Sequence, residues 1–73
     1  MAKFEFEIIE KLGTFSDPDD KWKKELNIIR WNENAARYDL RPWNESHEKM
    51  GKGITLSLYE IRKLKELLNS IEI

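Results

Sequence analysis

The sequence contains no cysteine and only one histidine, three glycines and two prolines among its 73 residues. The lack of cysteine excludes disulfides and thiolate metal sites, and His47 alone does not supply a histidine-based metal site. We therefore expect no metal ion and no cofactor. A chain of this length buries only about 60% of the surface that it exposes when unfolded, so it usually needs a disulfide, a metal or a second subunit. Only the last remains, and we expect one domain, residues 1–73, that forms a homodimer.

Long hydrophobic runs are missing as well. No apolar stretch approaches the roughly 20 residues that cross a bilayer, and the N-terminus carries no hydrophobic signal segment. These absences predict a soluble protein that does not bind membranes. The lack of cysteine fits a reducing compartment, and we expect a cytoplasmic location.

Catalytic groups are also scarce. No nucleophile stands beside a base, and nothing marks two carboxylates, Asp39 among them, as a pair that converges in a pocket. We therefore expect a binding protein rather than an enzyme.

Charge is unevenly distributed, although the whole chain carries a net charge of −1. Residues 1–20 hold two lysines against six acids, whereas residues 21–53 hold eight lysines and arginines against five acids. A basic middle in a near-neutral chain suits a localised surface for a polyanion. A solvated surface of mixed charge is the alternative.

Four segments have the composition and alternation of antiparallel β-strands. They run from Phe4 through Leu12, from Lys21 to Trp31, from Arg37 to Arg41, and onward from Ile54. The polar stretches 16–20, 32–36 and 44–50 separate them as turns or loops. The second strand has no purely apolar face, which fits a bend, a bulge or a functional outer face.

Two tryptophans near strand ends receive different predictions. Trp22 is expected in the core, because a tryptophan at strand spacing is usually well buried. Pro42 lacks an N–H and should end the third strand. Trp43 would then be exposed where the chain leaves the sheet.

The C-terminal segment is predicted to be the only helix. Ser57 and Glu60 form the capping-box pattern Ser-x-x-Glu, and apolar residues follow at three- and four-residue intervals. The expected fold is α+β, with a four-stranded antiparallel sheet followed by one helix (β-β-β-β-α). One helix cannot cover such a sheet, so we expect part of the apolar stripe to meet a second subunit. The expected dimer-interface residues are Ile61, Leu64, Leu68 and Ile71.

Several of these features occur together in a known family. Arg30-Trp31 closes one expected strand, Asp39–Trp43 follows in the next, and Lys52-Gly53-Ile54-Thr55-Leu56 precedes the helix. In this order and spacing they resemble the transcriptional coactivator family of positive cofactor four (p15). The resemblance is greatest to its compact bacterial, YdbC-like members and covers about residues 22–71.

The resemblance implies a homodimer whose curved sheets form grooves for single-stranded DNA or melted duplex. It further implies that Arg30, Arg41 and Lys52 contact the nucleic-acid backbone and that Trp43 belongs to the base-binding surface. Lys23 falls where the family is also basic, and Trp31 lies within one position of a family aromatic. With two neighbouring cations added, the expected site is Lys23, Arg30, Trp31, Arg37, Arg41, Trp43, Lys49 and Lys52.

The chemistry of these residue types agrees with that expectation. Lysine and arginine neutralise phosphates, so affinity should fall as salt rises, and exposed indoles can stack on any unpaired base. Few side chains are suited to reading base edges, which predicts single-stranded DNA binding with little sequence specificity. Two alternatives remain open: an RNA-binding protein, and a protein-interaction module that docks a polymerase or another part of the transcription machinery.

Overall fold

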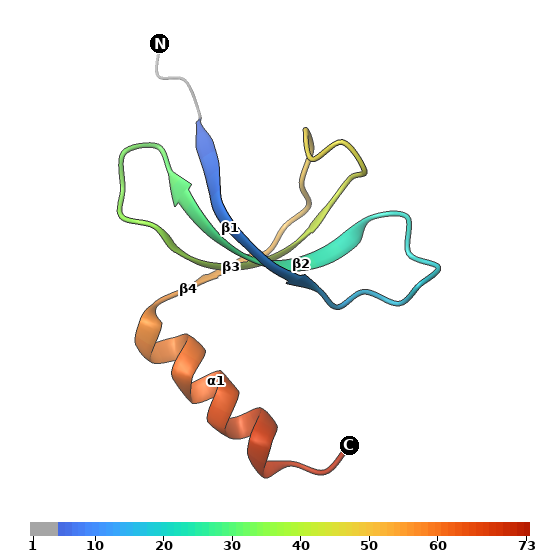
Figure 1. Ribbon diagram of the computed structural model, residues 1–73, viewed down its shortest axis with the longest axis vertical. Coiled ribbons are helices and arrows are strands. Elements are labelled where there is room, and N and C mark those ends of the chain that lie inside the picture. The colour runs from blue at the N-terminus through green and yellow to red at the C-terminus, as the bar shows by residue number, and fades with distance from the viewer. Residues whose placement is uncertain (1–4) are drawn as a thin grey trace.

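The computed structural model describes residues 5–73 and contains one four-stranded antiparallel sheet followed by one helix (Figure 1). The strands lie side by side in chain order, which confirms the predicted β-β-β-β-α arrangement. Phe4, expected at the start of the first strand, lies outside the described residues. The elements are β1 (Phe6–Thr14), β2 (Lys23–Trp31), β3 (Arg37–Trp43), β4 (Ile54–Leu56) and α1 (Leu58–Ser70).

The sheet is strongly curved, and the positions of its side chains measure the curvature. Phe6 pairs with Trp31 and Trp43 pairs with Lys23, at opposite ends of β2. A flat strand of nine residues would separate these ends by about 26 Å. The ring centroids of Phe6 and Trp43 nevertheless lie only 5.3 Å apart. The sheet therefore curls toward the side that carries these rings, here called the concave face, and α1 lies on the opposite side (Figure 1).

Residues that pair directly across neighbouring strands share a face of the sheet, so the pairing assigns each side chain to one side. The concave face carries Phe6, Ile8, Lys11, Thr14, Lys23, Glu25, Asn27, Ile29, Trp31, Arg37, Asp39, Arg41, Trp43 and Thr55. The helix-side face carries Glu7, Glu10, Lys24, Leu26, Ile28, Arg30, Tyr38, Leu40, Pro42, Ile54 and Leu56. The concave face is thus rich in aromatic and charged residues, and the helix-side face is largely aliphatic.

The third strand runs through Pro42 to Trp43, so the prediction that Pro42 ends it is wrong. The N–H and C=O of one residue point to the same side of an extended strand, and the Pro42 carbonyl accepts a hydrogen bond from the Gly51 N–H at 2.9 Å. The missing N–H of Pro42 therefore faces Gly51 and not β2. Pairing between β2 and β3 continues to Lys23 and Trp43 as a result.

The apolar core of the chain is small and lies mainly inside the curl. Ile29 and Trp43 on the concave face are 0% exposed, while Leu56 on the helix side is 7% exposed. Trp22 is 42% exposed, so its predicted place in the core is wrong. Trp22 precedes β2, and β3 ends opposite Lys23, so no residue of β3 lies across from this indole.

Helix α1 begins with the predicted capping box. Ser57 Oγ accepts a hydrogen bond from the Glu60 N–H at 3.1 Å, and Glu60 Oε1 accepts one from the Ser57 N–H at 2.8 Å. The apolar stripe of the helix is poorly covered, however, because none of its residues is buried. Leu67 and Leu68 are 62% and 52% exposed.

The chain exposes more surface than its size requires. Its accessible area is 6167 Å², whereas a compact monomer of this size exposes about 4,800 Å². Its Cα radius of gyration is 13.5 Å, against about 11 Å for a compact domain of this length. The projecting helix and its uncovered stripe account for this open shape (Figure 1).

The chain approaches β3 very closely at Gly53, just before β4. A Cβ atom built on Gly53 would lie 2.2 Å from the Leu40 carbonyl oxygen and 2.2 Å from Arg41 Cβ. A Cβ atom on Gly13, in β1, would meet nothing within 4 Å. The two glycines therefore make a matched pair for testing the contact.

We expect Gly53→Ala to lower the free energy of unfolding by about 1–3 kcal/mol, the usual cost of overpacking. Gly13→Ala should change it by less than about 1 kcal/mol, because the added methyl group enters open space. Urea denaturation of both variants checks this. Equal unfolding midpoints would contradict the close approach of the two strands.

Candidate nucleic-acid interface

The concave face is built around a carboxylate that water does not reach. Asp39, in the middle of β3, is 0% exposed. Arg41 donates to it twice, from Nε to Oδ1 at 2.5 Å and from Nη2 to Oδ2 at 2.8 Å. The Thr55 hydroxyl donates to Oδ2 at 3.0 Å and so links β3 to β4. Burying a charge is costly unless it is paired and hydrogen-bonded, and these three donors meet that requirement.

The same contacts fix the position of Arg41. Its guanidinium carbon lies 4.6 Å from the centre of the Trp31 ring, and Nη1 lies 3.4 Å from Met50 Sδ. The arginine side chain is only 15% exposed. Arg41 was expected to contact the nucleic-acid backbone; in this structure its charge is already engaged by Asp39, and its plane covers part of Trp31.

Trp43 is not the exposed platform that the sequence predicted. It is 0% exposed, because its ring packs 5.3 Å from Phe6 and 5.6 Å from His47, measured between centroids. The expectation of exposure is therefore wrong: continuation of β3 past Pro42 keeps this indole inside the curl. Trp31, which lies 5.8 Å from Phe6, is the partly exposed tryptophan of the concave face.

The loop between β3 and β4 is fastened to the concave face by His47. Its Nε2 lies 2.8 Å from Glu25 Oε2, and Asn27 Nδ2 donates to Glu25 Oε1 at 3.1 Å. Glu25 and Asn27 are 8% and 1% exposed.

Among residues 5–73 no three His, Asp or Glu side chains are grouped so as to hold a metal ion.

Apart from Arg41, the expected cations divide into three sets. Arg37, Lys49 and Lys52 are exposed, with Arg37 on the concave face and the other two in the segment between β3 and β4. Lys23 lies on the concave face, but its Nζ donates to the Pro18 carbonyl at 2.9 Å. Arg30 lies on the helix-side face and pairs with Glu7, so the structure does not place it with the others.

Lys11 is a cation of the concave face that the sequence analysis missed. It is exposed and lies opposite Asn27 in the pairing of β1 with β2. Regular alternation from Phe6 and Ile8 would put Lys11 on the other face, but the register shifts between Ile8 and Glu10. A bulge of this kind has no clear signature in the sequence.

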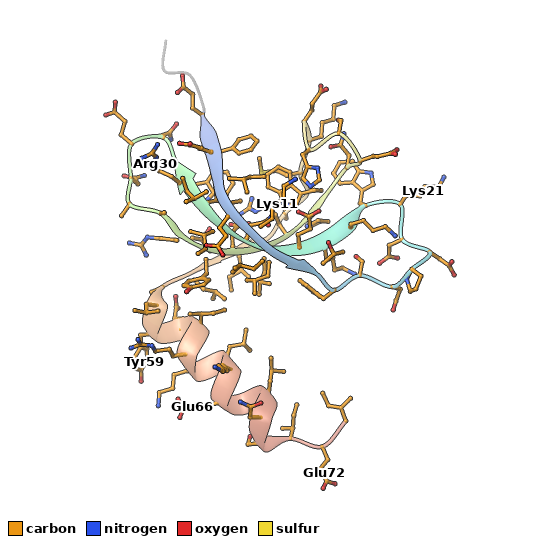
Figure 2. All side chains as sticks on the ribbon, in the orientation of Figure 1. Lys11, Lys21, Arg30, Tyr59, Glu66 and Glu72 are labelled. Carbon is orange, nitrogen blue, oxygen red and sulfur yellow. The ribbon has the colours of Figure 1, made fainter. Side chains whose placement is uncertain are left out.

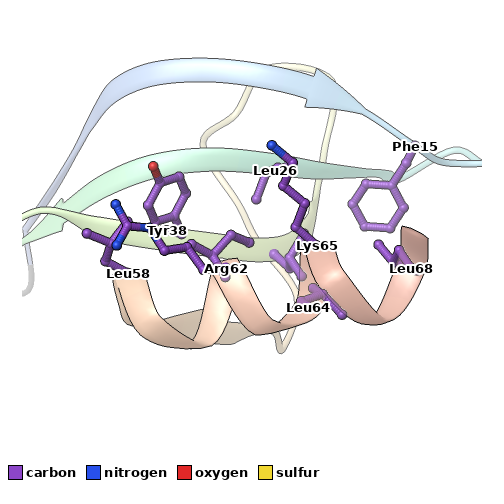
Figure 3. A pocket seen from close by; sticks show the side chains of 10 residues that line it. Phe15, Leu26, Tyr38, Leu58, Arg62, Leu64, Lys65 and Leu68 are labelled. Carbon is purple, nitrogen blue, oxygen red and sulfur yellow. The ribbon is translucent and has the colours of Figure 1, made fainter. Parts of the chain in front are cut away.

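The helix-side face has a different character. A hollow of about 840 Å³ lies between it and α1, with Leu26 and Tyr38 on the sheet facing Leu64 and Leu68 on the helix (Figure 3). The remaining lining residues are Phe15, Leu40, Leu58, Ile61, Arg62 and Lys65. Of the expected dimer-interface residues, Ile61, Leu64 and Leu68 line this hollow, whereas Ile71 follows the end of α1 and is 53% exposed.

A small curled sheet with cations around a partly exposed tryptophan defines a class of surface suited to nucleic acids. Residues 19–67 match the transcriptional coactivator p15 (PC4) family. An uncharacterized protein of Treponema pallidum (strain Nichols) is 41% identical over 70 residues, which cover 96% of this chain and 82% of that protein. The chain therefore belongs to the transcriptional coactivator p15 (PC4) family.

Family membership supports a nucleic-acid-binding, coactivator-like role. It also agrees with the resemblance found in the sequence. Strand β1 (Phe6–Thr14) precedes the matched residues, so the matched part comprises β2 to β4 and most of α1. Between residues 5 and 73, no helix is both long enough and apolar enough to cross a membrane.

We expect Arg41→Ala to lower the free energy of unfolding by about 3 kcal/mol, because it leaves the buried Asp39 carboxylate without its cation. Arg37→Ala removes the same charge on the same face, two residues from Asp39 on its other side, but from an exposed side chain. It should change stability by no more than about 0.5 kcal/mol. Thermal or urea unfolding of both variants checks this, and equal losses would contradict a structural role for the Asp39–Arg41 pair.

Proposed function

We propose that this protein is a homodimer that binds single-stranded DNA with little sequence specificity and acts as a coactivator-like binding protein rather than an enzyme. The observation that carries the proposal is that the concave face combines exposed cations with a partly exposed tryptophan, in a chain that belongs to this family. Lys11 and Arg37 are exposed cations of this face, Lys49 and Lys52 are exposed in the segment between β3 and β4, and Trp31 is partly exposed. Phosphates would be neutralised by the cations.

Two features favour single strands over duplex. Stacking on an indole requires an unpaired base and contributes about 1–3 kcal/mol per base. The concave face is also lined by packed aromatic rings, and the one helix of the described residues lies on the opposite side, so it cannot enter a groove of duplex DNA bound at this face. The part of Trp31 that remains exposed is the candidate stacking surface on this face, because Trp43 is sealed in the core.

Dimer formation is supported by the surface that one chain leaves uncovered. The excess over a compact monomer is about 1,400 Å² per chain, and obligate homodimers bury about 2,000–5,000 Å² in total. The hollow beside α1 and the exposed stripe Leu67-Leu68 lie together on the helix side. A second copy placed there leaves both concave faces open to nucleic acid.

We expect oligo-dT to quench the tryptophan fluorescence of the protein, with an affinity that falls as salt rises. Each lost phosphate contact lowers the slope of log affinity against log salt by about 0.7 for single strands. The double variant Arg37→Ala/Lys52→Ala should therefore lower the slope by about 1.4. Arg30→Ala, from the helix-side face, is the matched control and should leave it unchanged.

Titrations at 50 and 200 mM salt check this, with matched RNA and duplex DNA as competitors. Stronger competition by RNA would turn the proposal to an RNA-binding protein. No quenching by any nucleic acid would overturn it in favour of a protein-interaction module.

We expect sedimentation equilibrium to show a dimer and Leu68→Lys to shift it to monomer. Leu68 lies in the hollow below Phe15 (Figure 3) and is 52% exposed in a single chain, so a second copy packed there would bury a lysine ammonium at this position. Asn69→Lys, on the next residue and outside this hollow, should leave the dimer intact. A wild-type monomer, or dimers in both variants, would contradict the placement of the second copy.

A further inference from the structure

We propose that β1 extends the nucleic-acid surface beyond the family-matched part of the chain and that Lys11 is its phosphate-binding residue. This inference rests on the proposed function and names one more contact of the same surface. The ligand it assigns to Lys11 is a backbone phosphate of single-stranded DNA. Residues 19–67 match the family, so Lys11 lies outside the family-matched region.

A register shift in β1 places Lys11 on the concave face. The pair Ile8↔Ile29 is regular, and an unbroken ladder would continue with Glu10 opposite Asn27 and Lys11 opposite Leu26. The observed pairs are instead Glu10↔Ile28 and Lys11↔Asn27. Because a slip of one residue moves every following side chain to the other face, the shift replaces an acidic side chain on the concave face with a basic one.

The shift is local. A second irregularity between Lys11 and Gly13 follows at once, and the strand then continues with Thr14 opposite Glu25. Bulges commonly redirect a side chain beside a functional site. Here the two register shifts place the Lys11 side chain on the concave face and the Glu10 side chain on the helix side.

The ammonium group of Lys11 is available for a ligand. Lys11 is exposed, and within the described part of the chain no hydrogen bond or ion pair engages it. Lys23 and Arg41 on the same face differ in this respect, since Lys23 donates to Pro18 and Arg41 is held by Asp39. Arg37, like Lys11, is exposed. Figure 2 shows Lys11 on the side of the sheet away from α1.

The position of Lys11 also defines a path for the bound strand. Lys11 lies opposite Asn27, and the same row continues across the sheet to Asp39 and Thr55. Exposed cations thus stand on β1, at the start of β3 with Arg37, and before β4 with Lys52. A nucleic acid that contacts all of them must run across the β-strands, with Lys11 binding it at the β1 edge.

Lys11→Gln tests the assignment, with Lys21→Gln as the matched control. Lys21 is also exposed but lies at the outer end of the connection between β1 and β2 (Figure 2). Oligo-dT titrations should show a weaker affinity and a salt slope smaller by about 0.7 for Lys11→Gln only. The wild-type advantage over this variant should therefore shrink about 2.6-fold between 50 and 200 mM salt. A purely structural effect would not change with salt in this way.

The exchange variant Glu10→Lys/Lys11→Glu keeps the net charge and tests the register itself. It should bind oligo-dT more weakly than Lys11→Gln, because an acid then occupies the concave face. Tighter binding than wild type would mean that residue 10 faces the nucleic acid, which overturns the inference. Unchanged affinity and salt slope in Lys11→Gln, or an equal change in Lys21→Gln, would also overturn the assignment of Lys11. The proposed function would still stand in that case, provided that the wild-type protein binds oligo-dT. If the wild type binds no nucleic acid, both proposals fail.

Discussion

The buried charge of Asp39 is the constraint on which the concave face depends. A carboxylate with no exposure must keep its donors, and those donors come from Arg41 on the same strand and Thr55 on β4. The pairing therefore holds β4, a strand of only three residues, against β3. It also fixes the guanidinium over Trp31. One acidic side chain thus determines the edge of the sheet and the orientation of the aromatic surface.

Because the sheet is curved, its two faces pack differently. The curl brings Phe6, Trp31 and Trp43 together, so the concave face supplies a core from residues that a flat sheet would keep far apart. The helix-side face gains little from this, and its aliphatic side chains face a hollow instead of a packed layer. Apolar area removed from water contributes about 25 cal/mol per Å². The uncovered side is therefore where a partner can add most to the stability of the chain.

Local signals in the sequence predicted the elements well. The Ser57–Glu60 capping box specified the start of α1, and alternation specified the four strands that precede it along the chain. Both signals depend on residues within a few positions of each other, which is why they can be recognised without the fold.

The errors concern residues whose environment depends on distant parts of the chain. Whether Pro42 ends a strand depends on which neighbour its missing N–H would face, and here that neighbour is Gly51. The burial of Trp43 and the exposure of Trp22 follow from the curl and from where β3 ends. Of the expected site, Arg37, Lys49 and Lys52 occupy exposed positions, whereas Arg30 lies on the other face.

The irregular register of β1 has a consequence for how related sequences can diverge. In a strand with two distinct faces, gaining or losing one residue acts like a set of substitutions, because every later side chain exchanges sides. In β1 an acid and a base are adjacent at Glu10 and Lys11. A single-codon insertion or deletion near Ile9 could thus invert the local charge of the sheet surface without altering any other codon. Relatives with nearly identical residues in this strand can therefore present surfaces of opposite sign.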